Sequence, residues 1–294
     1  MTIKNVGVIG CGLMGAGIAQ VCAQSGYKTV VREVSEDLLK KGLGRINGFL
    51  AKSVEKGKLS AEQKAAAMAN LTGTTSLADL KNGDIIIEAA VENIDLKKEL
   101  FAELDPLCPP ATIFASNTSS LTITEMAAAT KRGDRFVGLH FFNPVPLMKL
   151  VEVVRTIATS QQTFDTAFAF AKSLGKDPIT CKDNSGFVVN LLLVPYLLDA
   201  IRAVENKVAS IEDLDKGMML GCGHPMGPLT LLDFVGIDTT YFIAEIMFKE
   251  YRDAKYAPPP LLRKMVLAGY HGKKSGKGFY DYSGEKPKVM DLGI

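Results

Sequence analysis

The sequence lacks the patterns that mark several classes of protein. Its five cysteines are an odd number without a Cys-x-x-Cys pair, so neither a disulfide framework nor a zinc knuckle is indicated. We expect them to be small buried apolar residues of a protein in a reducing compartment. The N-terminus shows no signal-peptide pattern, and the most apolar stretch, residues 187–201, is shorter than the roughly 20 residues of a membrane span. We therefore expect a cytoplasmic protein with neither a metal site nor a membrane partner.

Charge of one sign is not in excess either. The 294 residues include 34 Lys and Arg and 32 Asp and Glu, which gives a formal net charge of +2. This balance produces no general attraction to nucleic acid, so no nucleic-acid partner is expected. Apolar residues at 47% and charged residues at 22% are ordinary for a globular protein. The length suits about two domains of roughly 100–200 residues each.

The pattern of the sequence changes along the chain. In the first part, continuous apolar runs alternate with helical stretches, which predicts βαβ units in a mainly parallel sheet with helices on both faces. The expected strands are residues 6–10, 29–31, 84–90, 112–116, 136–142 and 150–154. From about residue 183 onward helical patterns replace the strands, and they include an apolar helix over residues 229–248.

A lysine-rich helical stretch, residues 36–70, lies between the second and third expected strands. The Lys-Gly-Lys segment at residues 56–58 interrupts it. Ser60, with Gln63 three residues later, predicts the N-cap of a second helix. The stretch is therefore expected to form a helix–turn–helix excursion from the sheet.

A glycine-rich segment follows the first expected strand and precedes a helix. It reads Gly10-Cys11-Gly12-Leu13-Met14-Gly15 and fits the Gly-x-Gly-x-x-Gly pattern. In that pattern the first glycine permits a tight turn, the second lets a pyrophosphate approach the backbone, and the third lets the helix pack closely on the strand. In its βαβ context the segment predicts a dinucleotide site, although a purely structural turn would use the same glycines.

Glu33 ends the second expected strand, where a carboxylate is able to bind the ribose 2′-hydroxyl. Such a carboxylate repels a 2′-phosphate and favours NAD, so that NADH is preferred to NADPH, whereas the neighbouring Arg32 is able to pair with that phosphate. These patterns together predict an α/β domain with a Rossmann-type doubly wound sheet over residues 1–182. They predict an all-α domain over residues 183–294.

Two titratable residues lie on neighbouring apolar strands. His140 follows the apolar run 136–139, at a strand end where doubly wound sheets bind ligands, and Glu152 lies in the next run. Histidine, with an unperturbed pKa of about 6.5, is suited to exchange the hydroxyl proton in nicotinamide-dependent chemistry. A carboxylate on an apolar strand needs a partner, and His140 is one. Spacing alone equally allows a core histidine and a glutamate at a solvent edge.

Polar groups near other element ends allow two interpretations as well. Residues 116–120, Ser-Asn-Thr-Ser-Ser, place hydroxyls and an amide after a strand, where they serve either a ligand or a helix N-cap. Asn190 lies on an apolar helix face, either as a ligand contact or as a buried amide satisfied by the backbone.

Seven segments, in order along essentially the whole chain, resemble one family. The sequence is similar to the short-chain L-3-hydroxyacyl-CoA dehydrogenases, and most of all to the stand-alone bacterial 3-hydroxybutyryl-CoA dehydrogenases. The His-Phe-Phe-Asn-Pro and Ser-Asn-Thr-Ser-Ser segments are far more specific for this family than the glycine pattern. The segments are residues 10–15, 88–93, 116–121, 140–144, 186–190, 225–228 and 276–280.

The resemblance implies an NAD-dependent interconversion of (S)-3-hydroxybutyryl-CoA and acetoacetyl-CoA, in fatty acid or butanoate metabolism, by a homodimer. It implies that His140 takes the 3-hydroxyl proton, that Glu152 holds His140, and that hydride passes to the nicotinamide. Ser119 and Asn190 match substrate-contacting residues of the family, and Ser119 is expected beside the cofactor too. The positions that match dinucleotide contacts are Glu92, Lys97, Asn143 and Lys274.

The excursion gains a role from the same resemblance. Its lysines, with Lys56 as the closest match and Lys52 beside it, are expected to meet the phosphates of coenzyme A, although a solvated helix face would carry the same charges. Leu191 stands where the family usually has arginine, and Glu33 where aspartate is commoner. A dehydrogenase of a free hydroxy acid or sugar acid, and a non-catalytic dinucleotide-binding protein, are the alternatives.

Overall fold

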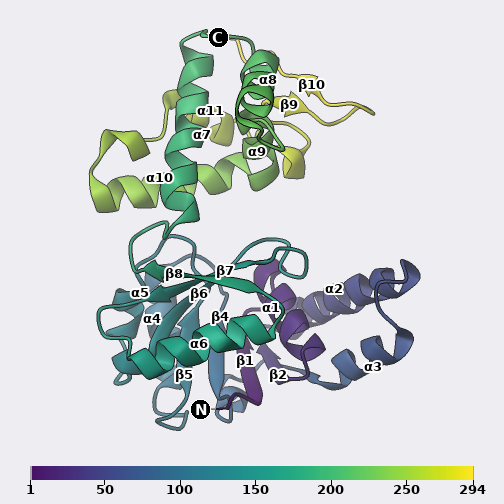
Figure 1. Cartoon of the computed structure of the whole chain (residues 1–294), viewed down its shortest axis with the longest axis vertical. Coiled ribbons are helices and arrows are strands. Elements are labelled where there is room, and N and C mark those ends of the chain that lie inside the picture. Colours follow the sequence, from purple (N-terminus) through teal and green to yellow (C-terminus); the bar gives the residue numbers. More distant parts are fainter. Residues whose placement is uncertain (1, 294) are drawn as a thin grey trace. The chain divides into compact units, whose positions relative to one another are not determined.

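The computed structural model describes residues 2–293, which divide into two compact units (Figure 1). The first unit ends at Phe187 and the second begins at Val188, later in the chain than the predicted change at residue 183. Each unit has its own apolar core.

An eight-stranded sheet forms the centre of the first unit, in the order β3-β2-β1-β4-β5-β6-β7-β8. Every neighbouring pair is parallel except β6 and β7, and this arrangement confirms the predicted doubly wound α/β architecture. Strands β3 and β8 were not predicted, because polar residues and glycine or proline interrupt their short apolar runs. The strands are β1 (Asn5–Ile9), β2 (Lys28–Arg32), β3 (Leu71–Thr74), β4 (Ile85–Glu88), β5 (Ile113–Ser116), β6 (Phe136–Phe141), β7 (Leu150–Arg155) and β8 (Asp177–Lys182).

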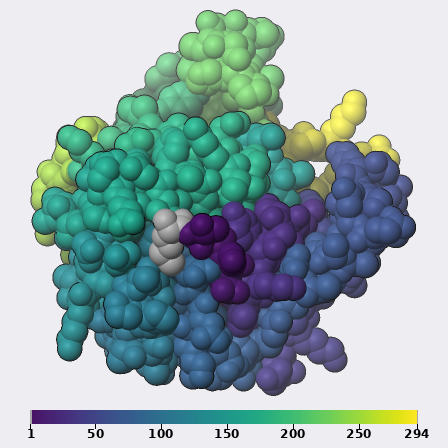
Figure 2. All heavy atoms as spheres, turned by 60° about the horizontal axis from the view of Figure 1, so that its bottom comes forward, coloured from purple at the N-terminus to yellow at the C-terminus, as the bar shows by residue number. Residues whose placement is uncertain are grey.

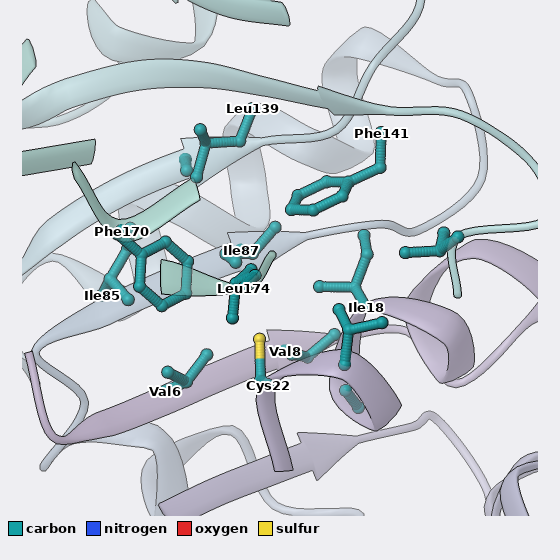
Figure 3. Close-up of a cluster of buried hydrophobic side chains, with 14 of the residues drawn as sticks. Val6, Val8, Ile18, Cys22, Ile85, Ile87, Leu139, Phe141, Phe170 and Leu174 are labelled. Carbon is teal, nitrogen blue, oxygen red and sulfur yellow. The ribbon is translucent and has the colours of Figure 1, made fainter. Parts of the chain in front are cut away.

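Helices cover both faces of the sheet, as its continuous apolar strands predict. One face packs against α1 (Leu13–Gln24) and α6 (Gln161–Ser173), where alternate residues of β1, β4 and β6 meet Ile18 and Phe170 (Figure 3). The other face packs against α4 (Ile94–Leu104) and α5 (Ile123–Ala127). Since successive side chains of a strand point to opposite faces, each strand contributes to both layers.

The predicted excursion consists of α2 (Glu36–Glu55) and α3 (Ala61–Ala69), which lie at the margin of the first unit (blue in Figure 2). The capping box at Ser60 and Gln63 is confirmed, with Gln63 N–H donating to Ser60 Oγ at 3.2 Å and Ser60 N–H donating to Gln63 Oε1 at 2.9 Å. Helix α2 also touches the glycine-rich loop, since a Cβ at Gly42 would lie 2.3 Å from the carbonyl oxygen of Cys11.

The second unit is helical, as predicted, with a short β9–β10 hairpin added. The prediction of a single helix over residues 229–248 is wrong, because Gly236 has a φ of 108° and separates two helices. Such a backbone conformation is open to glycine and strained for other residues. The elements are α7 (Val189–Glu205), α8 (Ile211–Cys222), α9 (Pro228–Val235), α10 (Ile237–Tyr251), α11 (Pro260–Leu267), β9 (Tyr280–Asp281) and β10 (Lys288–Val289), and the short 3₁₀ helices of the chain are η1 (Leu77–Leu80), η2 (Gly133–Arg135), η3 (Ala254–Tyr256) and η4 (Lys273–Ser275).

Four of the five cysteines are buried, whereas Cys222 is exposed. The prediction that all five are buried is therefore wrong for Cys222, which ends α8 where the chain turns through Gly223 into a loop. Burial raises the pKa of the Cys11 thiol to about 11, so this thiol stays protonated and unreactive at neutral pH. Over residues 2–293, none of the helices is long and apolar enough to cross a membrane.

Asp233 of α9 holds the C-terminal segment of the second unit. Its carboxylate accepts hydrogen bonds from the N–H groups of Phe279 and Tyr280, both at 2.9 Å, and from the Tyr282 hydroxyl at 3.0 Å. Gly278 permits this approach, because a Cβ there would lie 1.9 Å from Asp233 Oδ1. Burial raises the pKa of Asp233 to about 6, and the two backbone hydrogen bonds oppose that rise.

We expect the Asp233 carboxyl group to titrate near pH 6 in the folded protein, above the value of about 3.9 for an unfolded aspartate. Between these values the folded state keeps a proton that the unfolded state releases. The contribution of this group to the free energy of unfolding therefore falls as the pH rises from about 4 to about 6. Carbon-13 NMR of the carboxyl groups measures the titration, with the resonance assigned by its loss in Asp233→Asn. A midpoint below pH 4 would contradict the prediction.

Candidate active site

The glycine-rich loop between β1 and α1 has the geometry of a dinucleotide site. Gly10 has a φ of 93°, and a Cβ on it would lie 2.6 Å from the carbonyl oxygen of Ala89. A Cβ on Gly15 would lie 1.9 Å from the carbonyl oxygen of Gly10, so only glycine lets α1 approach the strand this closely. Gly12 faces open space, and the first turn of α1 has neither an acidic residue nor a side-chain cap. The N–H groups at this helix terminus are thus available to a pyrophosphate.

Glu33 follows β2 and reaches back to the same loop. One carboxylate oxygen accepts the N–H of Cys11 at 2.7 Å and the other accepts the N–H of Val34 at 2.7 Å. An acidic side chain held beside the loop in this way is suited to the ribose hydroxyls of a dinucleotide. Arg32 points elsewhere, and its Nε donates to the carbonyl oxygen of Thr75 at 3.2 Å.

Alternation along β4, β5, β6 and β7 brings polar side chains onto one face of the sheet. Each of these strands places an apolar residue in the core beneath α4 and α5, and the residue an even number of positions away shares that face. The polar residues placed in this way are Glu88, Ser116, His140 and Glu152. In the parallel strands they lie at the carboxyl ends, where ligands bind in doubly wound sheets.

His140 and Glu152 form a buried pair, so Glu152 does not lie at a solvent edge. The antiparallel register of β6 and β7 sets them directly opposite each other. His140 Nδ1 lies 2.6 Å from Glu152 Oε2, and the two residues are 4% and 0% exposed. A carboxylate only accepts hydrogen bonds, so Nδ1 carries the proton and Nε2 of the neutral ring is left as the acceptor.

Ser119 stands at that second nitrogen. Its hydroxyl oxygen is 3.0 Å from His140 Nε2, and its loop is joined to β6 because Asn117 Oδ1 accepts the Phe141 N–H at 2.9 Å. The rings of Phe142 and Phe187 lie 4.5 and 5.6 Å from the imidazole, measured between ring centroids. A base whose lone pair meets a hydroxyl on one side of the ring, with a carboxylate on the other side, provides the parts needed for proton exchange with an alcohol.

A second polar cluster, built from Glu88, Glu92 and Lys97, was not recognised as a unit from the sequence. The Lys97 ammonium lies 2.5 Å from Glu88 and 3.3 Å from Glu92. Lys97 is 1% exposed, although a cofactor contact was expected of it. The signal in the sequence is the acidic residue at the end of β4, which an apolar strand does not place in its core without a partner.

Comparison with known proteins shows to which family the chain belongs. A model described as the NAD binding domain of 3-hydroxyacyl-CoA dehydrogenase matches residues 5–184, and one described as the C-terminal domain of 3-hydroxyacyl-CoA dehydrogenase matches residues 186–282. The chain belongs to the 3-hydroxyacyl-CoA dehydrogenase family. It is accordingly an oxidoreductase with an NAD-binding first domain, and the resemblance stated from its motifs is confirmed.

Relatives of this dehydrogenase match it over nearly its whole length. The 3-hydroxybutyryl-CoA dehydrogenase of Mycobacterium tuberculosis (strain H37Rv) is 50% identical over 95% of this chain and 99% of its own. The human mitochondrial hydroxyacyl-coenzyme A dehydrogenase is 50% identical over 95% of this chain and 91% of its own. The crystal structure of (S)-3-hydroxybutyryl-CoA dehydrogenase from Ralstonia eutropha is similar with a TM-score of 0.92 at 47% identity, covering 96% of this chain and all of that one.

The other residues predicted for the dehydrogenase site fall into two groups. In the first unit, Leu13 and Asn143 line one cavity of about 70 Å³ between α1, α2 and residues 143–146, and Met14 is partly buried in α1. Lys52 and Lys56 are exposed at the end of α2. In the second unit, Asn190 lies in the first turn of α7, and Lys274 of η4 pairs with Asp238 at 2.6 Å.

Proposed function

We propose that this dehydrogenase interconverts (S)-3-hydroxybutyryl-CoA and acetoacetyl-CoA with NAD⁺ and NADH. The observation that carries the proposal is the row Ser119–His140–Glu152 near the carboxyl end of β6. The Ser119 hydroxyl oxygen lies 3.0 Å from His140 Nε2, and His140 Nδ1 lies 2.6 Å from Glu152 Oε2. Curated relatives about half identical to the chain, which carry the name 3-hydroxybutyryl-CoA dehydrogenase, support the substrate. The glycine-rich loop and Glu33 fit the cofactor.

Each side chain of the row has a separate role in proton transfer. Bound NAD⁺ supplies the acceptor for the hydride that leaves C3 of the substrate. Nε2 of His140 takes the proton of the 3-hydroxyl group, and Glu152 stabilises the imidazolium that results, because a buried carboxylate favours the charged ring. The Ser119 hydroxyl holds the substrate oxygen within reach of Nε2. In the direction of reduction His140 returns the proton.

Further roles in the proposal rest on the resemblance of the sequence to the family. Asn190 is assigned to the substrate, Lys52 and Lys56 to the phosphates of coenzyme A, and Asn143 and Lys274 to the dinucleotide. The proposal also includes a homodimer, a cytoplasmic location and the order of domains predicted above. The exposure of both lysines suits a contact with a charged ligand.

Steady-state kinetics with matched substrates tests the proposal. We expect NADH oxidation with acetoacetyl-CoA to have a kcat/KM well above that with free acetoacetate, and above those with longer 3-ketoacyl-CoA substrates. A comparable kcat/KM for the free acid would favour a hydroxy-acid dehydrogenase instead. The absence of turnover on every substrate, with NADH still bound, would point to the non-catalytic alternative.

The choice of dinucleotide gives a separate prediction. We expect NADH to be preferred to NADPH in kcat/KM, because Glu33 is negative beside the loop and Arg32 is engaged with the Thr75 carbonyl. Glu33→Gln should narrow the preference, since it removes the charge that repels a 2′-phosphate. Initial rates with the two cofactors measure both effects. Equal or better use of NADPH by the unaltered enzyme would contradict the prediction.

A further inference from the structure

Glu88 is a fully buried acidic group near the proposed site. It ends β4, is 0% exposed, and its carboxylate accepts three hydrogen bonds from different parts of the first unit. The donors are the Ala90 N–H at 2.7 Å, the Ser116 hydroxyl at 2.5 Å and the Lys97 ammonium at 2.5 Å. A buried carboxylate with three donors is fixed in place, and it fixes its donors in turn.

The ammonium of Lys97 extends this arrangement to a second carboxylate. It lies 2.5 Å from Glu88 and 3.3 Å from Glu92, whose side chain is 36% exposed. At 1% exposure Lys97 offers almost no surface to a ligand. Lys97 therefore acts on the site by orienting Glu92. The negative charge of Glu88 makes the burial of the Lys97 ammonium possible.

Glu92 and Ser116 connect Glu88 and Lys97 by hydrogen bonds to the loop that bears Ser119. Glu92 Oε1 accepts the Thr118 hydroxyl and, at 3.2 Å, the Ser119 N–H. The Ser116 hydroxyl oxygen accepts a hydrogen bond from the Thr118 N–H at 3.2 Å, and the same hydroxyl donates a hydrogen bond to Glu88. Glu88 thus reaches the loop by two routes, and the Ser119 hydroxyl at the end of the loop lies 3.0 Å from His140 Nε2.

We propose that Glu88 is a positioning residue, which acts through Lys97 and Glu92 to set the Ser119 hydroxyl at His140 Nε2. The proposal rests on the proposed function for its effect on turnover, but not for its effect on the imidazole. Without the Glu88 charge, Lys97 draws Glu92 toward itself and away from the Ser119 N–H. A displacement of about 1 Å at a reacting group costs on the order of 10²-fold in rate.

The first test is Glu88→Gln, with Glu99→Gln on the exposed side of α4 as the matched control. We expect kcat with acetoacetyl-CoA, measured at saturating NADH, to fall about 10²-fold in Glu88→Gln, with no change in the control. If Glu88 acted only on the binding of the dinucleotide, the Kd of NADH would rise and kcat at saturating NADH would keep its wild-type value, which would overturn the proposal.

The second test reads the imidazole without any substrate. The chain has three histidines, so nitrogen-15 NMR of the ring nitrogens follows His140 while His224 and His271 report on the fold. We expect the Nε2 resonance of His140 to shift in Glu88→Gln and the other histidines to keep their resonances. An unshifted Nε2 resonance in a folded variant would overturn the positioning role. Failure of acetoacetyl-CoA as substrate would overturn the proposed function alone.

A double variant covers the case in which Glu88→Gln does not fold. Glu88→Gln with Lys97→Met removes both buried charges, so no unpaired charge is left in the core. Glu92 then lacks the ammonium that orients it, and we expect the same shift of the His140 Nε2 resonance and the same loss of kcat. Wild-type values of both in this variant would overturn the proposal.

Discussion

Replacement of His140 by glutamine is expected to lower kcat with acetoacetyl-CoA by about 10²–10⁴-fold, the usual contribution of a general acid or base. The ring is enclosed between Ser119 and Glu152, so Nε2 is the nitrogen at which a substrate proton is exchanged. Glutamine is close to histidine in size and keeps a polar end, but it does not take up a proton at neutral pH. We therefore expect the Kd of NADH, measured by fluorescence, to change little.

The matched control for this variant is His224→Gln. His224 lies in the second unit, where its Nδ1 is 3.2 Å from the Tyr196 hydroxyl, and no step above is assigned to it. We expect wild-type kcat in the control. Near-normal turnover in His140→Gln would remove His140 from the mechanism, while loss of NADH binding in that variant would show damage to the fold.

Replacement of Glu152 by glutamine is expected to lower kcat by up to about 10⁴-fold, as when the orienting carboxylate of a catalytic triad becomes an amide. The amide is neutral, so the imidazolium loses its buried partner. It also has a donor end, which is able to face Nδ1 and move the ring proton to Nε2, where it blocks the base.

Glu103→Gln is the control for Glu152→Gln, since Glu103 is exposed on α4 and has no part in the site. Circular dichroism separates loss of fold from loss of function, which matters because Glu152 is 0% exposed. Near-normal kcat in folded Glu152→Gln would contradict a working pair of His140 and Glu152.

Much of the first unit follows from local patterns that the sequence displays directly. The glycine-rich segment, the capping box at Ser60 and the apolar runs of the central strands depend on residues close together in the chain, so their physics is local. The pair of His140 and Glu152 was open to two interpretations because it depends on the register of β6 against β7. Register is set by packing across the sheet, which spacing along the chain does not fix.

Other features depend on contacts between distant segments and were missed for that reason. Glu88 and Lys97 belong together only once α4 lies over the end of β4. The break at Gly236 was overlooked because the residues on both sides are apolar and suit one long helix. The short strands β3 and β8 form because neighbours offer them hydrogen bonds, although their own propensity is low.

The alternation of side chains gives the centre of the sheet one apolar face and one face that bears the polar residues of the site. Beneath α1 and α6, strands β4 and β6 contribute only apolar groups, while beneath α4 and α5 the same two strands contribute Glu88 and His140. A slip of β6 by one residue would turn His140 into the hydrocarbon layer and bring Leu139 opposite the carboxylates. The pairing of the strands is therefore as necessary to the site as its polar residues, because the apolar packing that sets the register also sets which face His140 occupies.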